Sequence, residues 1–145
     1  MDGRLWGQLY TANEQGNSVS AYRMDSVNGV LTHLETLPTV PDAFAAVSHC
    51  AEIKFSPDGR WLFAPNRALP ATGCCSVAVF AVDGTTGALR LSEICIVADV
   101  PENFSPQHIA LDTALGQVRF EACAPSLASP SQLLLLQSRR GWLTF

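Results

Sequence analysis

Short segments of alternating apolar and polar residues, separated by turns rich in Gly, Pro and Asp, run along much of the chain. Residues 52–55 predict a short strand, and Trp61 to Ala64 predict its hairpin partner. Between them Ser56-Pro57-Asp58-Gly59 predicts a turn, because proline fixes φ and glycine accepts the left-handed region. The pattern continues with a strand over 76–82, a hairpin loop over 83–87 and an outer strand over 89–97. Helix caps and a 3.6-residue period are absent, so the sequence predicts β-structure.

Internal matches repeat this pattern about every 55 residues. LYTAN from Leu9 matches LFAPN from Leu62, and SVSAYRMD from Ser18 matches SVAVFAVD from Ser76. Similar segments begin at Gly29, Gly87 and Gly141, namely GVLTHL, GALRLS and GWLTF. A further match joins EIKFSPDGRWLF, residues 52–63, to HIALDTALGQVRF, residues 108–120. A four-stranded antiparallel unit that repeats in this way is typical of a β-propeller blade.

The repeats predict an all-β fold of antiparallel four-stranded blades in one partial domain over residues 1–145. Blade-like units are expected at about 8–40, 50–98 and 106–145, and the first lacks a clear inner strand. This makes about two and a half to three blades, whereas propellers close with roughly four to eight. The two end blades are therefore expected to leave apolar faces and strand edges open, and self-association through these blade edges is expected.

Composition restricts the partners. The chain has 145 residues, 48% of them hydrophobic and 15% charged, with a net charge of −4 and no basic cluster longer than Arg139-Arg140. Nucleic acid and anionic membranes are therefore not expected to bind. The N-terminal residues show no apolar stretch of the signal-peptide kind, and the longest aliphatic run is Leu133 to Leu136, so a cytoplasmic protein is expected.

Cysteine usage predicts neither a disulfide framework nor a metal site. The five cysteines are an odd number and none shows CxxC spacing, so reduced and mostly buried thiols are expected (Cys50, Cys74, Cys75, Cys95 and Cys123). No cofactor is expected.

Three motifs give the chain a resemblance to a known family. These are NExxNSVxxYxxD from Asn13, HxAE from His49 ahead of SPDG, and the pair Asn66-Arg67 after the second strand. Together they resemble the lactonase family of seven-bladed propellers, which includes bacterial-type 6-phosphogluconolactonases and fungal carboxy-muconate cyclases. The resemblance runs from about Leu9 to Val97 and implies a sugar-phosphate lactone as a small anionic substrate.

The resemblance also implies catalytic residues near the mouth of a central channel. Lactone hydrolysis needs a base that activates water, a group that polarises the carbonyl, and cations that hold an anionic substrate. Glu52 is expected to act as base or acid, and Arg67 to clamp a phosphate or carboxylate. His49, in the loop before the inner strand, is expected to share proton transfer, because the ordinary pKa of histidine is near neutral. The alternative for His49 and Glu52 is a structural hydrogen-bond network between blades.

Asn66, Asn13 and His108 are the other expected substrate-binding residues, with Arg67. Asn66 either orients the substrate or caps its own turn, and Asn13 and Glu14 either line the channel or cap a loop. His108 lies in Pro106-Gln107-His108-Ile109, where the family pattern has arginine at the position of Gln107.

Two classes of function follow. The first is an enzyme that hydrolyses a sugar-phosphate lactone in carbohydrate metabolism, through the pentose phosphate pathway, with a carboxy-muconate cyclase-like isomerase as the related chemistry. The second is a catalytically inactive propeller fragment that acts as an interaction module.

Overall fold

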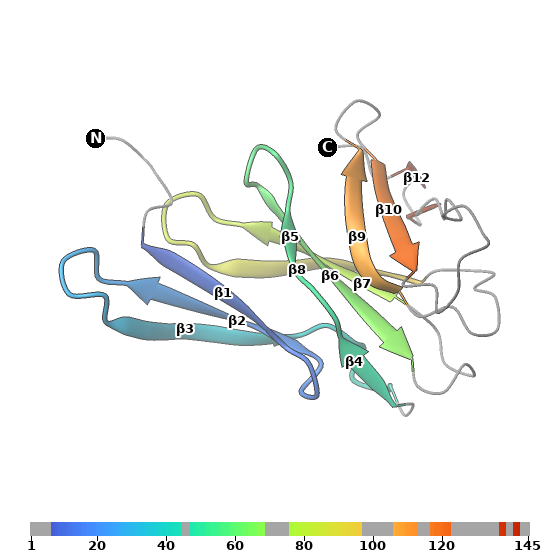
Figure 1. Cartoon of the computed structure of the whole chain (residues 1–145), viewed down its shortest axis with the longest axis horizontal. Coiled ribbons are helices and arrows are strands. Elements are labelled where there is room, and N and C mark those ends of the chain that lie inside the picture. The colour runs from blue at the N-terminus through green and yellow to red at the C-terminus, as the bar shows by residue number, and fades with distance from the viewer. Residues whose placement is uncertain are drawn as a thin grey trace.

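The computed structural model describes residues 7–44, 47–68, 76–96, 106–112, 117–122, 137–138 and 141–142. Every regular element in these ranges is a β-strand, and every pair of neighbouring strands is antiparallel (Figure 1). The predicted all-β, antiparallel class is therefore confirmed. Among the same residues, none forms a helix long and apolar enough to cross a membrane.

The first sheet has three strands in the order β1-β2-β3. They are β1 (Gln8–Asn13), β2 (Ser18–Met24) and β3 (Leu31–Pro38). Asn13 pairs with Ser18 across the β1–β2 turn, and Val19 pairs with Leu37 of β3. Among the described residues, β2 is the strand that pairs with β1, and no further strand pairs with β1 on its other edge.

The second sheet has a divided inner strand. Its elements are β4 (Ser48–Cys50), β5 (Lys54–Phe55), β6 (Trp61–Ala68), β7 (Ser76–Val82) and β8 (Leu89–Ile96). Both β4 and β5 pair with β6, and the order continues through β7 to β8. The predicted limits of the third strand, 76–82, agree with β7, and the outer strand ends one residue before the predicted Val97.

The sequence prediction was wrong for the first two strands of this sheet. The inner strand was expected at 52–55, but it consists of β4 and β5 with residues 51–53 between them. The second strand was expected to end at Ala64, but β6 continues to Ala68. The reason is tertiary: Asn66 has a pairing partner on each side, Cys50 in β4 and Ser76 in β7, so the strand continues beyond its apolar core.

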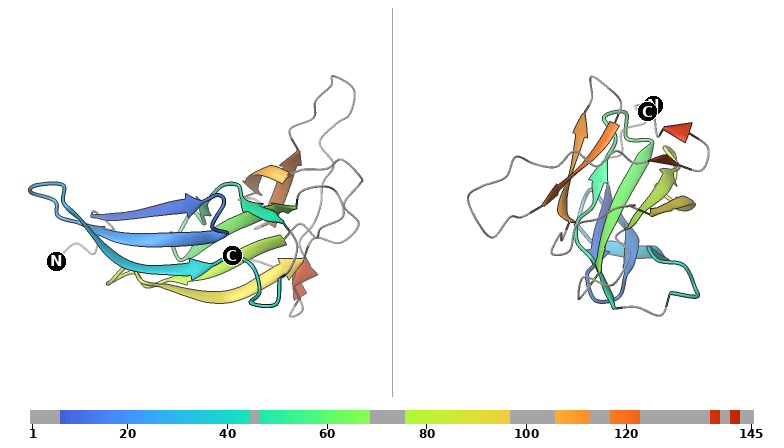
Figure 2. Two further views of the ribbon diagram at one scale, coloured as in Figure 1. Left: turned by 90° about the horizontal axis from the view of Figure 1, so that it is seen from below. Right: turned by 90° about the vertical axis from the view of Figure 1, so that its right-hand side faces the viewer.

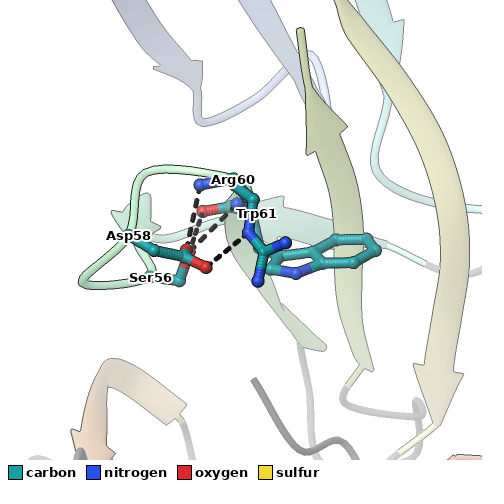
Figure 3. Close-up of polar contacts among 4 residues, drawn as sticks. All are labelled: Ser56, Asp58, Arg60 and Trp61. Atoms are coloured by element: carbon teal, nitrogen blue, oxygen red, sulfur yellow. Dashed lines mark hydrogen bonds and ion pairs between the residues drawn. The ribbon is translucent and has the colours of Figure 1, made fainter. Parts of the chain in front are cut away.

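Side chains hold the predicted turn between β5 and β6 in place. The carboxylate of Asp58 accepts hydrogen bonds from the hydroxyl of Ser56 and from Nε of Arg60, the latter at 2.6 Å (Figure 3). Ser56 Oγ also accepts from the backbone N–H of Trp61 at 3.0 Å. Gly59 has φ +70°, as the turn prediction requires. Asp58 and Arg60 therefore belong to the turn itself.

The same irregularity occurs in both sheets. A bulge interrupts the register between Ala21 and Tyr22 in the first sheet and between Val79 and Phe80 in the second. These positions are equivalent in the internal repeat, so the two sheets are copies of one unit in backbone detail as well as in sequence.

The two sheets lie side by side with their strands running in a similar direction (Figure 2). Apolar residues from both form one buried cluster: Val19 and Ala21 of the first sheet, with Cys50, Leu62, Ala64, Ala78, Phe80, Val82 and Leu89 of the second. Tyr10 adds a polar link, because its hydroxyl donates to the carbonyl of Gly87 at 2.7 Å. Its ring also packs edge-on against Phe55, with centroids 5.2 Å apart. The interface between the sheets is the main core of the described structure.

Two further hairpins follow. They are β9 (Pro106–Asp112) with β10 (Gln117–Ala122), and β11 (Gln137–Ser138) with β12 (Gly141–Trp142). β9 lies beside β6 (Figure 1). The division of residues 1–145 into three blade-like units stays a prediction.

Candidate functional site

The candidate site lies where the β1–β2 turn of the first sheet meets β4 of the second (Figure 1). Asn17 takes a left-handed φ of 45°, a conformation that asparagine tolerates. Its side-chain amide donates to the carbonyl of Ser48 at 2.8 Å. The carbonyl of Glu14 accepts from the backbone N–H of Cys50 at 3.0 Å. These two bonds fix the turn on the second sheet and hold the side chain of Glu14 beside β6.

Glu14 and Arg67 form an ion pair there, between Oε1 of the carboxylate and Nη2 of the guanidinium. The side chain of Arg67 is 23% exposed and that of Glu14 is 57% exposed, so the pair is open to solvent on the carboxylate side. Glu14 was expected only as a channel-lining or capping residue. A stronger signal was present, because the matched segments LYTAN and LFAPN are followed by Glu14 and Arg67 respectively.

His49 lies directly opposite Arg67 in the pairing of β4 with β6. It was expected in a loop before the inner strand, but it belongs to β4, because β4 pairs with the unexpected extension of β6. Nδ1 of His49 and Nε of Arg67 are both buried and lack a hydrogen-bond partner within the described part of the chain. Buried polar atoms of this kind call for an explanation, and a ligand is one. Thus the structure brings Glu14, His49 and Arg67 together.

Asn66 lies inside the sheet interface and has no exposed surface. Its Oδ1 accepts from the hydroxyl of Thr39 at 2.6 Å, and its Nδ2 donates to the Thr39 carbonyl at 2.7 Å and to Ser76 Oγ at 3.1 Å. Asn66 was expected to contact substrate, but its amide could do so only if these hydrogen bonds to Thr39 and Ser76 broke. We therefore give Asn66 a supporting role, in which it holds the β6 backbone next to Arg67.

The remaining predicted residues lie elsewhere. Glu52 is in the segment between β4 and β5, and its Oε1 is 3.5 Å from Nζ of Lys54. Asn13 ends β1, and its amide nitrogen donates to the hydroxyls of Ser18 and Ser20 at 3.0 and 2.8 Å. His108 belongs to β9, and its side chain is outside the described part of the structure.

Cys50, next to His49, lies in surroundings that disfavour its thiolate form. Burial raises the pKa of its thiol to about 11, and the negative charge of Glu14 acts in the same direction. Burial likewise raises the pKa of Cys95 to about 11. Both cysteines are free and buried, as expected, whereas Cys74, Cys75 and Cys123 lie outside the described residues. In the ranges that are described, no three His, Cys, Asp or Glu side chains are grouped as metal ligands would be.

Comparison with known proteins gives this site a family context. A family model for "Lactonase, 7-bladed beta-propeller" matches residues 7–112. The 6-phosphogluconolactonase of Klebsiella pneumoniae is 34% identical over 99 residues, which cover 68% of this chain and 28% of that protein. The 6-phosphogluconolactonase of Pectobacterium carotovorum is 34% identical over 58 residues, 40% of this chain and 18% of that protein.

A solved structure supports the fold. The periplasmic gluconolactonase PpgL of Pseudomonas aeruginosa superposes with a TM-score of 0.63 at 24% sequence identity. The match covers 89% of this chain and 39% of that one. The chain thus spans well under half the length of the relatives that it matches. Its stacked antiparallel sheets are part of a β-propeller, and the chain belongs to the lactonase family of seven-bladed β-propellers.

Proposed function

We propose that this chain contributes to the hydrolysis of a sugar-phosphate lactone, in the manner of a 6-phosphogluconolactonase. One observation carries the proposal: in a lactonase-family chain, Glu14 and Arg67 form an ion pair at the junction of two sheets, and His49 lies opposite Arg67 in the pairing of β4 with β6. A role in carbohydrate metabolism and a cytoplasmic location belong to the same proposal. The proposed location rests on the sequence, which shows no long apolar stretch. The relatives do not decide it, because one solved relative is periplasmic.

The three side chains suit the steps of the reaction. Water adds to the lactone carbonyl carbon, the bond from that carbon to the ring oxygen breaks, and the ring oxygen takes up a proton. His49 or a carboxylate accepts the proton that the attacking water loses. Arg67 carries five N–H donors, and the ion pair with Glu14 uses Nη2, so other donors remain for a phosphate or for the developing oxyanion.

Two carboxylates compete for the role of acid or base. Glu52 was the expected acid or base, and in the structure its carboxylate forms an ion pair with Lys54. Glu14 lies beside Arg67 and within the same junction as His49. We therefore add Glu14 to the proposed catalytic residues and rank it ahead of Glu52. Asn13 and His108 remain proposed substrate contacts.

Hydrolysis of 6-phosphogluconolactone by the purified chain tests the proposal. We expect the rate to exceed spontaneous hydrolysis, and we expect glucono-lactone, which lacks the phosphate, to be a poorer substrate. Arg67→Ala should remove the acceleration. Arg60→Ala is the matched control, because the side chain of Arg60 is 74% exposed in the turn and its described contact is with Asp58 of the same turn. A rate no higher than that of buffer, or an equal loss in both variants, would refute the proposed activity.

A further inference from the structure

Thr39 lies in the segment that leads from the end of β3 to the start of β4, and none of its surface is exposed. Its backbone N–H donates to the carbonyl of Asn17 at 2.8 Å. Its hydroxyl donates to Oδ1 of Asn66 at 2.6 Å, and its carbonyl accepts from Nδ2 of Asn66 at 2.7 Å. The three polar groups of Thr39 therefore bind the β1–β2 turn on one side and β6 on the other.

Both partners of Thr39 are close in the chain to members of the ion pair. Asn17 follows Glu14 by three positions in the β1–β2 turn, and Asn66 directly precedes Arg67 in β6. Thr39 thus connects the backbone that carries the carboxylate to the backbone that carries the guanidinium. The ion pair is partly open to solvent, and such a pair does little by itself to hold two long side chains in one geometry. Its geometry therefore depends on the two backbones being fixed relative to each other.

The internal repeat shows that the blade pattern does not require this hydroxyl. Pro38 and Ile96 are equivalent positions, because each pairs with the serine that begins the neighbouring strand. Thr39 follows the first and Val97 follows the second, so the repeat has valine where the first unit has threonine. The two side chains have nearly the same size and differ in one hydroxyl. The hydroxyl of Thr39 is therefore particular to the junction that carries the ion pair.

We propose that Thr39 is a positioning residue for the Glu14–Arg67 ion pair, and that it acts through a hydrogen-bond network whose two ends are Asn17 and Asn66. Its effect on catalysis rests on the proposed function, in which this pair takes part in lactone hydrolysis. Without the hydroxyl, Oδ1 of Asn66 loses its partner, and β6 keeps only the bond from Nδ2 to the Thr39 carbonyl. The guanidinium then no longer meets the carboxylate in a single geometry, and a catalytic group displaced by about 1 Å can lose about 100-fold in rate.

The Nε–H signal of Arg67 in the NMR spectrum of the nitrogen-labelled chain tests the positioning without any substrate. Arg67→Lys identifies the signal, and Glu14→Gln shows how it moves when the ion pair is lost. We expect Thr39→Val to move it in the same direction as Glu14→Gln, and Thr39→Ser, which keeps the hydroxyl, to leave it in place. Circular dichroism checks that each variant folds. If Thr39→Val does not fold, Asn17→Gly loosens the other end of the network, accepts the same left-handed φ of 45°, and should move the signal likewise.

Ser56→Ala is the matched control. Ser56 is also buried, and its hydroxyl donates to Asp58 in the turn before β6, at the opposite end of that strand from Arg67, so this variant should leave the signal in place. An unmoved signal in folded Thr39→Val, or an equal shift in Thr39→Ser or Ser56→Ala, would overturn the positioning role.

Kinetics on 6-phosphogluconolactone separate this role from the proposed function. In an active chain, kcat/KM should fall by at least about tenfold in Thr39→Val and recover in Thr39→Ser. Equal kcat/KM values for Thr39→Val and the parent would overturn the proposal. The expected NMR shift in a chain that does not hydrolyse the lactone would support the positioning role and refute the proposed function alone.

Discussion

Glu14 and Arg67 form an ion pair across the junction of two neighbouring sheets, although 53 positions separate them in the chain. Each follows the same strand of the repeat, since LYTAN precedes Glu14 and LFAPN precedes Arg67. The repeat therefore places opposite charges at equivalent ends of adjacent units. Stacking the units brings these ends together, and His49 joins them through its pairing with Arg67.

Replacing the two carboxylates in turn will show which one acts in catalysis. Glu14→Gln keeps the shape of the side chain and removes its charge, and we expect it to lower kcat/KM by at least tenfold, about 1.4 kcal/mol. Glu52→Gln should have the smaller effect, because the ion pair described for Glu52 is with Lys54. Kinetics on 6-phosphogluconolactone would compare them. The reverse order of effects would return the role to Glu52.

Asn66 should contribute to stability far more than its repeat equivalent, Asn13. Asn66→Ala would leave the buried hydroxyls of Thr39 and Ser76 without their partner, at a cost of about 2–3 kcal/mol. Asn13→Ala should cost less than about 1 kcal/mol, because water reaches its partly exposed surroundings. Urea unfolding at one low protein concentration measures both. Equal losses would contradict the structural role of Asn66.

Gly87 and Gly29 are equivalent turn glycines that differ in their surroundings. Their φ values are +75° and +72°, so alanine should cost about 1–2 kcal/mol at either site. At Gly87 the added Cβ would also meet the amide of Gln8, whereas at Gly29 it would meet nothing within 4 Å. We expect Gly87→Ala to be the more destabilising variant in thermal unfolding, and Gln8→Ala in the same chain to recover the difference. No recovery would contradict the assigned cause.

The turn aspartate, Asp58, should titrate at unusually low pH. The hydroxyl of Ser56 and the side chain and N–H of Arg60 lower the pKa of Asp58 from 3.8 to about 2. Because the folded-state pKa is the lower one, the stabilisation is complete above about 4 and is lost as the pH falls towards 2. An NMR titration of the carboxyl carbon would show an apparent pKa near 2, and Ser56→Ala should raise it. A value near 3.8 in the parent chain would mean that the turn is not closed as described.

The sequence was sufficient for the features that depend on local chemistry. Alternating residues in 76–82 predicted β7 with its observed limits, and the Ser56 to Gly59 turn has its left-handed glycine. The repeat predicted stacked copies of one antiparallel unit, because a unit with two apolar faces needs neighbours on both sides. The family followed from three motifs and is confirmed by the match to residues 7–112.

Tertiary packing decided the candidate site. The local pattern ended the second strand at Ala64, yet β6 runs on to Ala68 because β4 and β7 pair with it on both sides. This extension moves His49 from an expected loop into a strand opposite Arg67. Glu14 reaches Arg67 only because Asn17 and Cys50 fix the β1–β2 turn on β4. The alternation of apolar and polar residues and the choice of turn residues involve positions that are close in the chain, so the sequence determines them. A cluster drawn from two sheets depends on how those sheets stack, and only the folded chain decides it.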